Sequence, residues 1–117
     1  MASGIVPVKV FLNVETDEGD VRDSPLSRGY RNGDRVRLVA EDHMQMDFNG
    51  ESVMKLLENV FDQGNGYGSH GVIQSAFMAG TRSLSVGDIV VVGETAYAVC
   101  KAGWAPVSMD SASVVQR

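Results

Sequence analysis

The sequence has little of the material from which most metal and catalytic sites are built. Its 117 residues include one cysteine, Cys100, and two histidines, His43 and His70. One cysteine excludes an internal disulfide, and a zinc or iron site needs several Cys, His or carboxylate ligands at a spacing that is absent here. We therefore expect no metal, no cofactor and no catalytic residue, and we interpret both histidines as surface or loop side chains and Cys100 as a small apolar residue of a strand.

Long apolar runs and positive charge are also scarce. No run approaches the ~20 apolar residues that span a bilayer, and the start at 1–4 lacks the charged and apolar parts of a signal peptide. Ten Lys and Arg against 15 Asp and Glu give a net charge of −5. This charge disfavours sequence-independent nucleic-acid binding, which depends on basic side chains that neutralise phosphates. We expect a cytoplasmic protein that does not enter membranes.

The composition that is present is typical of a globular protein, with 44% apolar and 21% charged residues. A chain of this length can bury one core but not two. The sequence therefore predicts a single α+β domain over residues 1–107, followed by a flexible tail at 108–117.

Three segments of the N-terminal half show the alternation of apolar and polar residues that is typical of strands. The first runs from Ile5 to Val14. The second follows the turn residues Asn32-Gly33-Asp34 and places three apolar residues on one face. These three are Val36, Leu38 and Ala40. The third contains Met44, Met46 and Phe48, and it either continues the second strand or forms an apolar-lined connection.

The middle of the chain has the apolar spacing of helices. One stripe, formed by Val53, Leu56, Leu57, Val60 and Phe61, predicts a packed amphipathic helix over about 50–63 with Asn49 as its cap. The glycine-rich stretch Gly64–Gly71 is expected to be a loop, because ordering so many glycines costs backbone entropy. Val72–Ala79 favours a second, short helix.

The C-terminal half begins with a second Gly-Asp pair, Gly87-Asp88, which leads into a predicted β-hairpin of Ile89–Val92 and Ala96–Cys100. Trp104 is expected to close this unit. The fold class is therefore α+β, a mainly antiparallel sheet with a Gly-Asp-led C-terminal hairpin and one packed helix. The echo between Gly33-Asp34 and Gly87-Asp88 is interpreted as a common way to start a strand, in preference to a duplication.

Arginines supply the best candidates for a binding surface. Half of the basic residues fall between Arg22 and Arg37, and the candidates there are Arg28, Tyr30, Arg31, Arg35 and Arg37. Acidic residues from Glu15 to Asp23 stand just upstream, so the favoured interpretation is a solvated region in which the charges compensate each other. Tyr67 and His70 in the glycine-rich loop are further candidates for partner contacts. Phosphate binding by this loop is disfavoured, because a helix precedes it and no lysine follows.

The sequence Arg82-Ser83-Leu84-Ser85-Val86-Gly87-Asp88, with its aliphatic strand and the later Tyr97, Cys100 and Gly103-Trp104, resembles a known pattern. It is similar to a motif of small uncharacterised proteins of actinobacteria, their plasmids and their phages, and to the short YodL-like domain of mobile-element proteins. The resemblance implies a small accessory protein of a phage or mobile element in the host cytoplasm. Such families define no catalytic residue, so none is carried over.

These observations lead to one expected function and two alternatives. We expect a non-enzymatic protein that binds and modulates a host or phage protein through the Arg22–Arg37 region or the Gly64–Gly71 loop. The first alternative is a small nucleic-acid-binding module that uses the arginine-rich strand face, and the second is a structural or assembly subunit of a virion. The partner, the oligomeric state and the pairing of the two Gly-Asp strands stay open.

Overall fold

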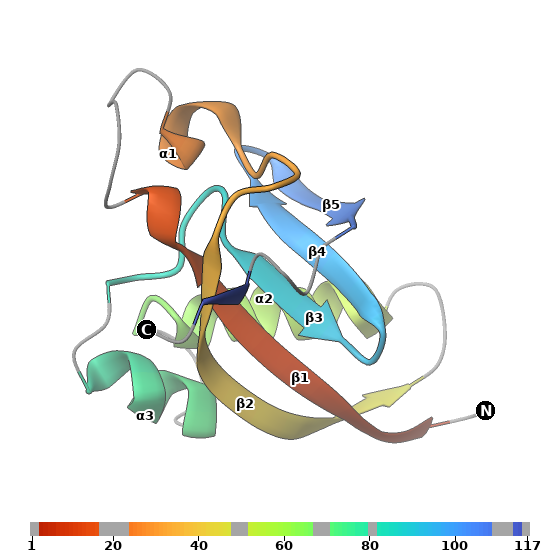
Figure 1. Ribbon diagram of the computed structural model, residues 1–117. Helices are drawn as coiled ribbons and strands as arrows, with labels where there is room; N and C mark the ends of the chain where they lie inside the picture. Colours follow the sequence, from red (N-terminus) through yellow and green to blue (C-terminus); the bar gives the residue numbers. More distant parts are fainter. Residues whose placement is uncertain are drawn as a thin grey trace.

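The computed structural model describes residues 3–16, 24–47, 52–66, 71–79, 82–108 and 114–115. Its centre is a six-stranded sheet with the order β5-β4-β3-β1-β2-β6 (Figure 1). The strands are β1 (Ser3–Asn13), β2 (Val36–Asp47), β3 (Ile89–Val92), β4 (Thr95–Cys100), β5 (Gly103–Val107) and β6 (Val114–Val115). The helical elements are η1 (Val14–Thr16), α1 (Pro25–Arg28), α2 (Ser52–Gln63) and α3 (Val72–Met78). The α+β fold class predicted from the sequence is confirmed.

The two Gly-Asp strands share this sheet but do not pair with each other. β2 and β3 lie on opposite sides of β1, and both run antiparallel to it. Their first residues are therefore brought together beside the last residues of β1, where Asn13 is opposite Val36 and Phe11 is opposite Ile89. The sheet is antiparallel throughout except at β6, which runs parallel to β2.

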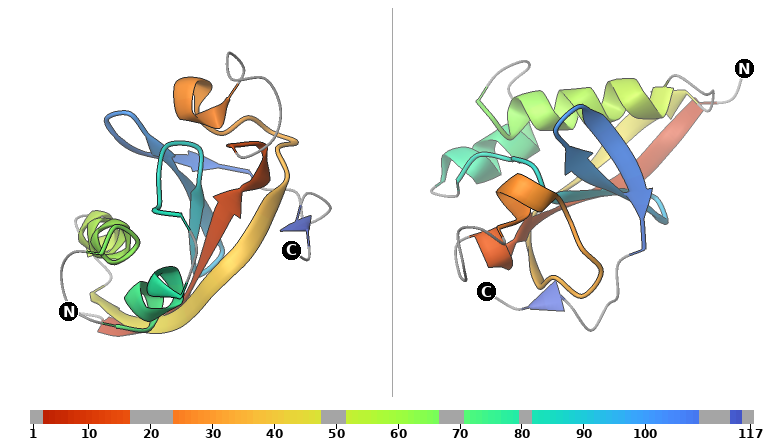
Figure 2. Two further views of the ribbon diagram at one scale, coloured as in Figure 1. Left: turned by 90° about the vertical axis from the view of Figure 1, so that its left-hand side faces the viewer. Right: turned by 90° about the horizontal axis from the view of Figure 1, so that it is seen from above.

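One face of the sheet carries the larger core, and helices α2 and α3 lie over that face (Figure 2). Alternate residues of the strands point toward the helices, as the period of two requires. The buried members of this cluster include Val8, Val10 and Leu12 of β1, Leu57 and Val60 of α2, and Ile73 and Phe77 of α3. Their burial removes the apolar stripes of both helices from water and supplies the main driving force for folding.

The opposite face holds a smaller apolar cluster. Its buried residues are Phe11, Val36, Ile89, Ala96 and Ala98, and Tyr30 and Val114 pack against them. β3 and β4 are thus buried on both faces. Double burial explains why these strands read as nearly continuous apolar runs in the sequence.

A β-bulge in β2 changes which residues share a face. Val10 is opposite Ala40, but the next residue, Phe11, is opposite Leu38, so Val39 has no residue opposite it. The extra residue moves Val36 to the smaller cluster while Ala40 stays in the larger one. The prediction that Val36, Leu38 and Ala40 share one face is therefore wrong, because simple alternation does not reveal a bulge.

The predicted helices and the C-terminal hairpin are confirmed, and the β-strands extend further than expected. β2 continues without a break through Met44 and Met46, so the strand alternative holds for these two residues. Trp104 lies within an additional strand, β5, and its ring meets that of Phe61 edge-on at 6.3 Å. Val114 and Val115 lie in the segment predicted to be a flexible tail, and they pair with β2 as β6. The proposed cap Asn49 and the apolar Phe48 lie outside the described residues.

Candidate functional site

The two Gly-Asp pairs build the same turn. The backbone N–H of Asp34 donates to the carbonyl of Arg31 at 2.9 Å, and that of Asp88 donates to the carbonyl of Ser85 at 3.1 Å. In return the aspartate side chains accept the N–H of Arg31 at 2.9 Å and of Ser85 at 2.8 Å. The residue before each aspartate is a glycine with φ of +99° or +94°, a conformation that L side chains rarely adopt.

Each aspartate also pairs with an arginine six positions earlier in the chain. Arg28 binds Asp34 through both terminal nitrogens at 2.9 and 3.0 Å, and Arg82 binds Asp88 in the same way at 2.8 Å for each contact. Asp34 is 5% exposed and Asp88 is fully buried. A carboxylate this deep is stable only when it is paired and hydrogen-bonded, so the arginines have a structural role here.

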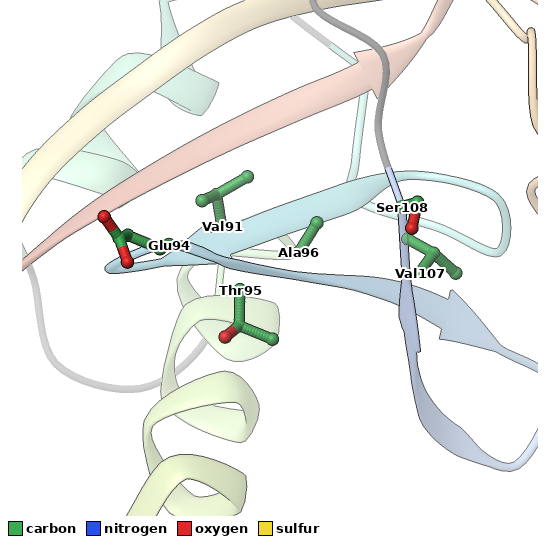
Figure 3. Close-up of a pocket in the computed structure, with 6 residues that line it drawn as sticks. All are labelled: Val91, Glu94, Thr95, Ala96, Val107 and Ser108. Atoms are coloured by element: carbon green, nitrogen blue, oxygen red, sulfur yellow. The ribbon is translucent and has the colours of Figure 1, made fainter.

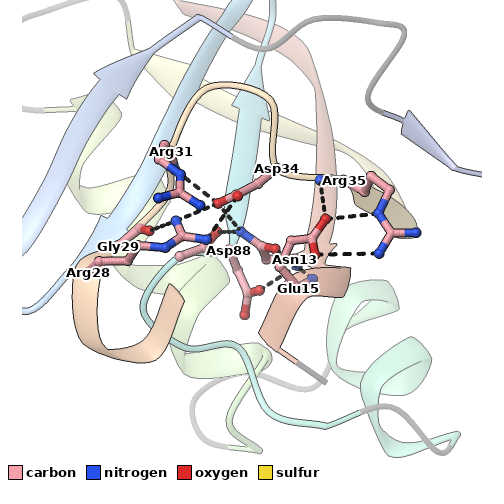
Figure 4. A network of polar contacts seen from close by, with 9 residues as sticks. Asn13, Glu15, Arg28, Gly29, Arg31, Asp34, Arg35 and Asp88 are labelled. Atoms are coloured by element: carbon pink, nitrogen blue, oxygen red, sulfur yellow. Dashed lines mark hydrogen bonds and ion pairs between the residues drawn. The ribbon is translucent and has the colours of Figure 1, made fainter. Parts of the chain in front are cut away.

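Asn13 at the end of β1 joins the two turns (Figure 4). Its backbone N–H donates to Asp88 at 2.7 Å, and its side-chain amide donates to Asp34 at 3.0 Å and to the carbonyl of Gly87 at 3.1 Å. Its own carbonyl accepts a bond from Arg82 at 3.1 Å. This polar network fastens the starts of β2 and β3 to the end of β1.

Internal ion pairs account for two of the arginines that the sequence offers as a binding surface. Arg28 binds Asp34, and Arg35 binds Glu15 at 2.8 Å. The hydrogen bond from Arg35 holds the pKa of the Glu15 carboxyl below its ordinary value. These pairs agree with the interpretation that the charges in this region compensate each other.

The remaining candidates that the structure describes do not gather into one patch. Arg31 is exposed beside Asp34, whereas Arg37 is half-buried opposite Leu12 in the register of β1 and β2. The Tyr30 ring packs against the smaller apolar cluster. Tyr67 and His70 lie outside the described residues. Sequence reasoning missed Asn13 and the pairing of Asp34 and Asp88 with arginines, although one signal was available, since both Gly-Asp pairs follow an arginine at the same distance.

The outer edge of β2 is a second feature that the sequence analysis did not identify. β6 pairs with β2 only at Val36 and Arg37. From Leu38 onward, β1 is the only described strand that pairs with β2. Among the described residues, the part of β2 from Leu38 to Asp47 therefore has no strand on its outer side, and we refer to it as the β2 edge.

The direction of the backbone groups along this edge follows from one hydrogen bond on the other side of β1. Gly93 donates its N–H to the carbonyl of Pro7 at 2.9 Å, so the carbonyl of Pro7 points away from β2. Pro7 is opposite His43, and such a pair in an antiparallel ladder exchanges no hydrogen bond. The N–H and C=O of His43 therefore point outward from the sheet, as do those of Glu41 and Gln45 two residues away on each side.

One of these outward groups is capped by a neighbouring side chain. The backbone N–H of His43 donates to the carboxylate of Asp42 at 2.8 Å. Glu41, His43 and Gln45 are all exposed, and Asp42 is half-buried. The β2 edge thus presents accessible backbone donors and acceptors, with one donor held by an acidic side chain.

The other edge of the sheet is protected differently. β5 has five residues, and one of them, Pro106, has no N–H to offer. A short strand that contains proline is a poor template for another strand. The β2 edge is longer and is therefore the better template for an added strand.

A surface hollow of about 390 Å³ lies on the face of the sheet opposite the helices (Figure 3). Its lining consists of Val91, Glu94, Thr95, Ala96, Val107 and Ser108. Glu94, Thr95 and Ser108 are the polar residues of this lining, with the Thr95 side chain directed toward the helix side of β4 (Figure 3), and the lining contains no histidine or cysteine that could act as a base or a thiol nucleophile. We assign no chemistry to this hollow.

The described residues contain no group of three or more His, Cys, Asp or Glu side chains that could hold a metal ion. No helix in the part of the chain that the structure describes is both long and apolar enough to cross a membrane. In comparisons with known proteins, no family model, no curated protein and no solved structure matches this chain.

Proposed function

We propose that this protein is a non-enzymatic accessory protein that binds another protein by adding a strand of its partner to the β2 edge. The observation that carries the proposal is the row of outward N–H and C=O groups at Glu41, His43 and Gln45. An extended partner segment gains affinity from main-chain hydrogen bonds to such a row and specificity from alternate side chains. The resemblance of residues 82–104 to proteins of phages and mobile elements supports a host or phage protein as the partner.

The Arg22–Arg37 region is less suitable as a binding surface than the β2 edge. A binding site needs groups that are available to the partner, and the guanidinium groups of Arg28 and Arg35 already bind Asp34 and Glu15. Releasing either arginine would break an internal ion pair. At the β2 edge the outward backbone groups do not pair with another described strand, and the internal contact to be exchanged is the single hydrogen bond from the N–H of His43 to Asp42.

Two variants of His43 test the proposal. His43→Pro removes the outward N–H and leaves the pairing with β1 intact, because His43 exchanges no hydrogen bond with Pro7. His43→Ala is the matched control, since it removes the same side chain and keeps the N–H. Tagged forms of both variants and of the wild type are incubated with nuclease-treated bacterial lysate, and the retained proteins are identified by mass spectrometry.

The expected result is a stoichiometric partner that the wild type and His43→Ala retain and His43→Pro loses. Amide hydrogen exchange confirms that β1 and β2 remain paired in both variants. Equal retention by His43→Pro and His43→Ala would contradict strand addition at this edge. A partner that disappears from the wild type on nuclease treatment would instead support the nucleic-acid-binding alternative.

A further inference from the structure

Resting on the proposed function, we infer that the segment received by the β2 edge is an extended, cationic peptide and that Asp42 is the residue that selects it. The inference rests on three features of the edge. These are the charge around it, the cross-strand neighbours of its carboxylates and the hydrogen bond that Asp42 makes to the backbone. Each feature points to a lysine or arginine on the partner.

The two carboxylates of the edge have different neighbours on β1. Glu41 is opposite Lys9, which supplies a nearby positive charge. Asp42 is opposite the buried Val8 and has no cation across the strand pair. A half-buried carboxylate with no cation opposite it gains more from a positive charge that a partner brings than one that already faces a lysine.

The hydrogen bond between Asp42 and His43 makes the charge of the partner decisive. The carboxylate occupies the outward N–H of His43 at 2.8 Å, which is one of the donors that an added strand needs. A neutral or acidic segment would have to displace the carboxylate and leave it without a partner. A lysine or arginine beside Asp42 would form an ion pair with the carboxylate. The N–H of His43 would then be free to bond to the new strand.

A second copy of this chain is a poorer occupant of the edge. Antiparallel pairing of two β2 edges centred on Asp42 would place the Asp42 carboxylates of the two copies opposite one another. Like charges on neighbouring strands are destabilising. The net charge of −5 adds to this repulsion and favours the approach of a cationic partner.

A displayed library of random peptides about ten residues long, which is enough for one strand, provides the probe. The library is selected on the wild-type protein and then depleted on His43→Pro, so that only peptides dependent on the β2 edge remain. The expected result is enrichment of Lys and Arg over Asp and Glu in the remaining peptides. Edge-dependent peptides that are neutral or acidic would overturn the inference and leave the proposed function standing, whereas a selection without any edge-dependent peptide would overturn both.

The Asp42→Ala variant separates selection by Asp42 from a general charge effect. One enriched cationic peptide and its version with Ser at every Lys and Arg are labelled, and their dissociation constants are measured by fluorescence anisotropy. For the wild type we expect the cationic peptide to bind about tenfold more tightly. Asp42→Ala should bind the neutral peptide more tightly than the wild type does and should lose most of the preference. The control Glu58→Ala, at an exposed position of α2, should retain the preference.

Two results would refute the role of Asp42. The first is an unchanged preference in Asp42→Ala, and the second is weaker binding of the neutral peptide by that variant. A concentration-dependent dimer of the wild type that His43→Pro abolishes would replace the peptide with a second copy of the chain as the occupant. Sedimentation of both proteins over a range of concentrations gives this answer.

Discussion

Asp34 and Asp88 are equivalent residues of two copies of one turn, and Asn13 donates a hydrogen bond to each of them. Both turns have an arginine six positions before the aspartate and a glycine with positive φ directly before it. The strands that follow lie on the two sides of β1. The echo between the Gly-Asp pairs therefore extends beyond a shared dipeptide, and it marks a repeated way of anchoring the start of a strand beside Asn13.

Removing the more deeply buried aspartate should destabilise the fold strongly. In Asp88→Ala the guanidinium of Arg82 and the N–H groups of Ser85 and Asn13 lose their acceptor. Breaking a buried ion pair by removing one partner costs about 3–5 kcal/mol of unfolding free energy. Urea denaturation followed by the fluorescence of Trp104, the only tryptophan, measures this loss.

Two further variants keep this prediction testable. Asp88→Asn retains one oxygen acceptor and should lose less stability, so it provides a measurement if Asp88→Ala does not fold. The exposed Glu58→Ala should change the unfolding free energy by less than about 0.5 kcal/mol. A loss at Asp88 as small as that at Glu58 would show that the network contributes little to stability.

The two turn glycines offer a matched pair of substitutions. Gly33 and Gly87 have nearly the same positive φ, but a Cβ on Gly33 would meet nothing within 4 Å, whereas one on Gly87 would lie 2.5 Å from the Cβ of Pro25. Gly33→Ala should cost about 1–2 kcal/mol from the backbone conformation alone. Gly87→Ala should cost clearly more, because Pro25 is buried and its ring cannot swing aside. Equal losses in denaturation experiments would mean that Pro25 moves freely.

Asp34 should make the stability of the protein sensitive to acid. Burial raises the pKa of its carboxyl, but the hydrogen bonds from Arg28, Arg31 and Asn13 outweigh burial and hold the pKa below the ordinary 3.8. A folded-state pKa below the unfolded value stabilises the protein above the unfolded pKa, and this contribution is lost as the pH falls through the folded pKa.

Asp34→Asn tests this dependence on pH. The variant should be less stable than the wild type at neutral pH, and the difference in unfolding free energy should shrink as the pH falls below about 4. Urea denaturation at a series of pH values measures the difference. A gap that stays constant down to about pH 2 would exclude Asp34 as a source of the acid sensitivity.

Local patterns in the sequence were sufficient to predict much of the fold. The apolar stripe from Val53 to Phe61 predicts α2, and the aliphatic run at Ile89–Val92 followed by a glycine predicts the β3–β4 hairpin. These elements depend on contacts between residues close in the chain or on a strong periodicity. The predicted fold class follows from them.

The features that were missed depend on contacts between distant residues. The bulge at Val39 arises from the fit of β2 to β1, and β6 forms only because residues 114–115 return to the start of β2. Asn13 lies 75 positions from Asp88 in the chain, so no local pattern shows that the two are bonded. The β2 edge is likewise a consequence of strand order, which a single sequence does not give.

The return of the chain at β6 leads to a last prediction. Val114 is half-buried, pairs with Val36 and packs against the smaller apolar cluster, so Val114→Asp should place a charge against this cluster. We expect a loss of about 1–3 kcal/mol of unfolding free energy, the usual cost of a polar group in an apolar contact. Hydrogen exchange at residues 36–38 should become faster, because the β2 edge then begins at Val36.

Val72→Asp is the matched control, since Val72 is 56% exposed and an acidic residue in the first turn of α3 is favourable. If the Val114 variant were as stable as this control, with unchanged exchange, then β6 would contribute nothing to the sheet.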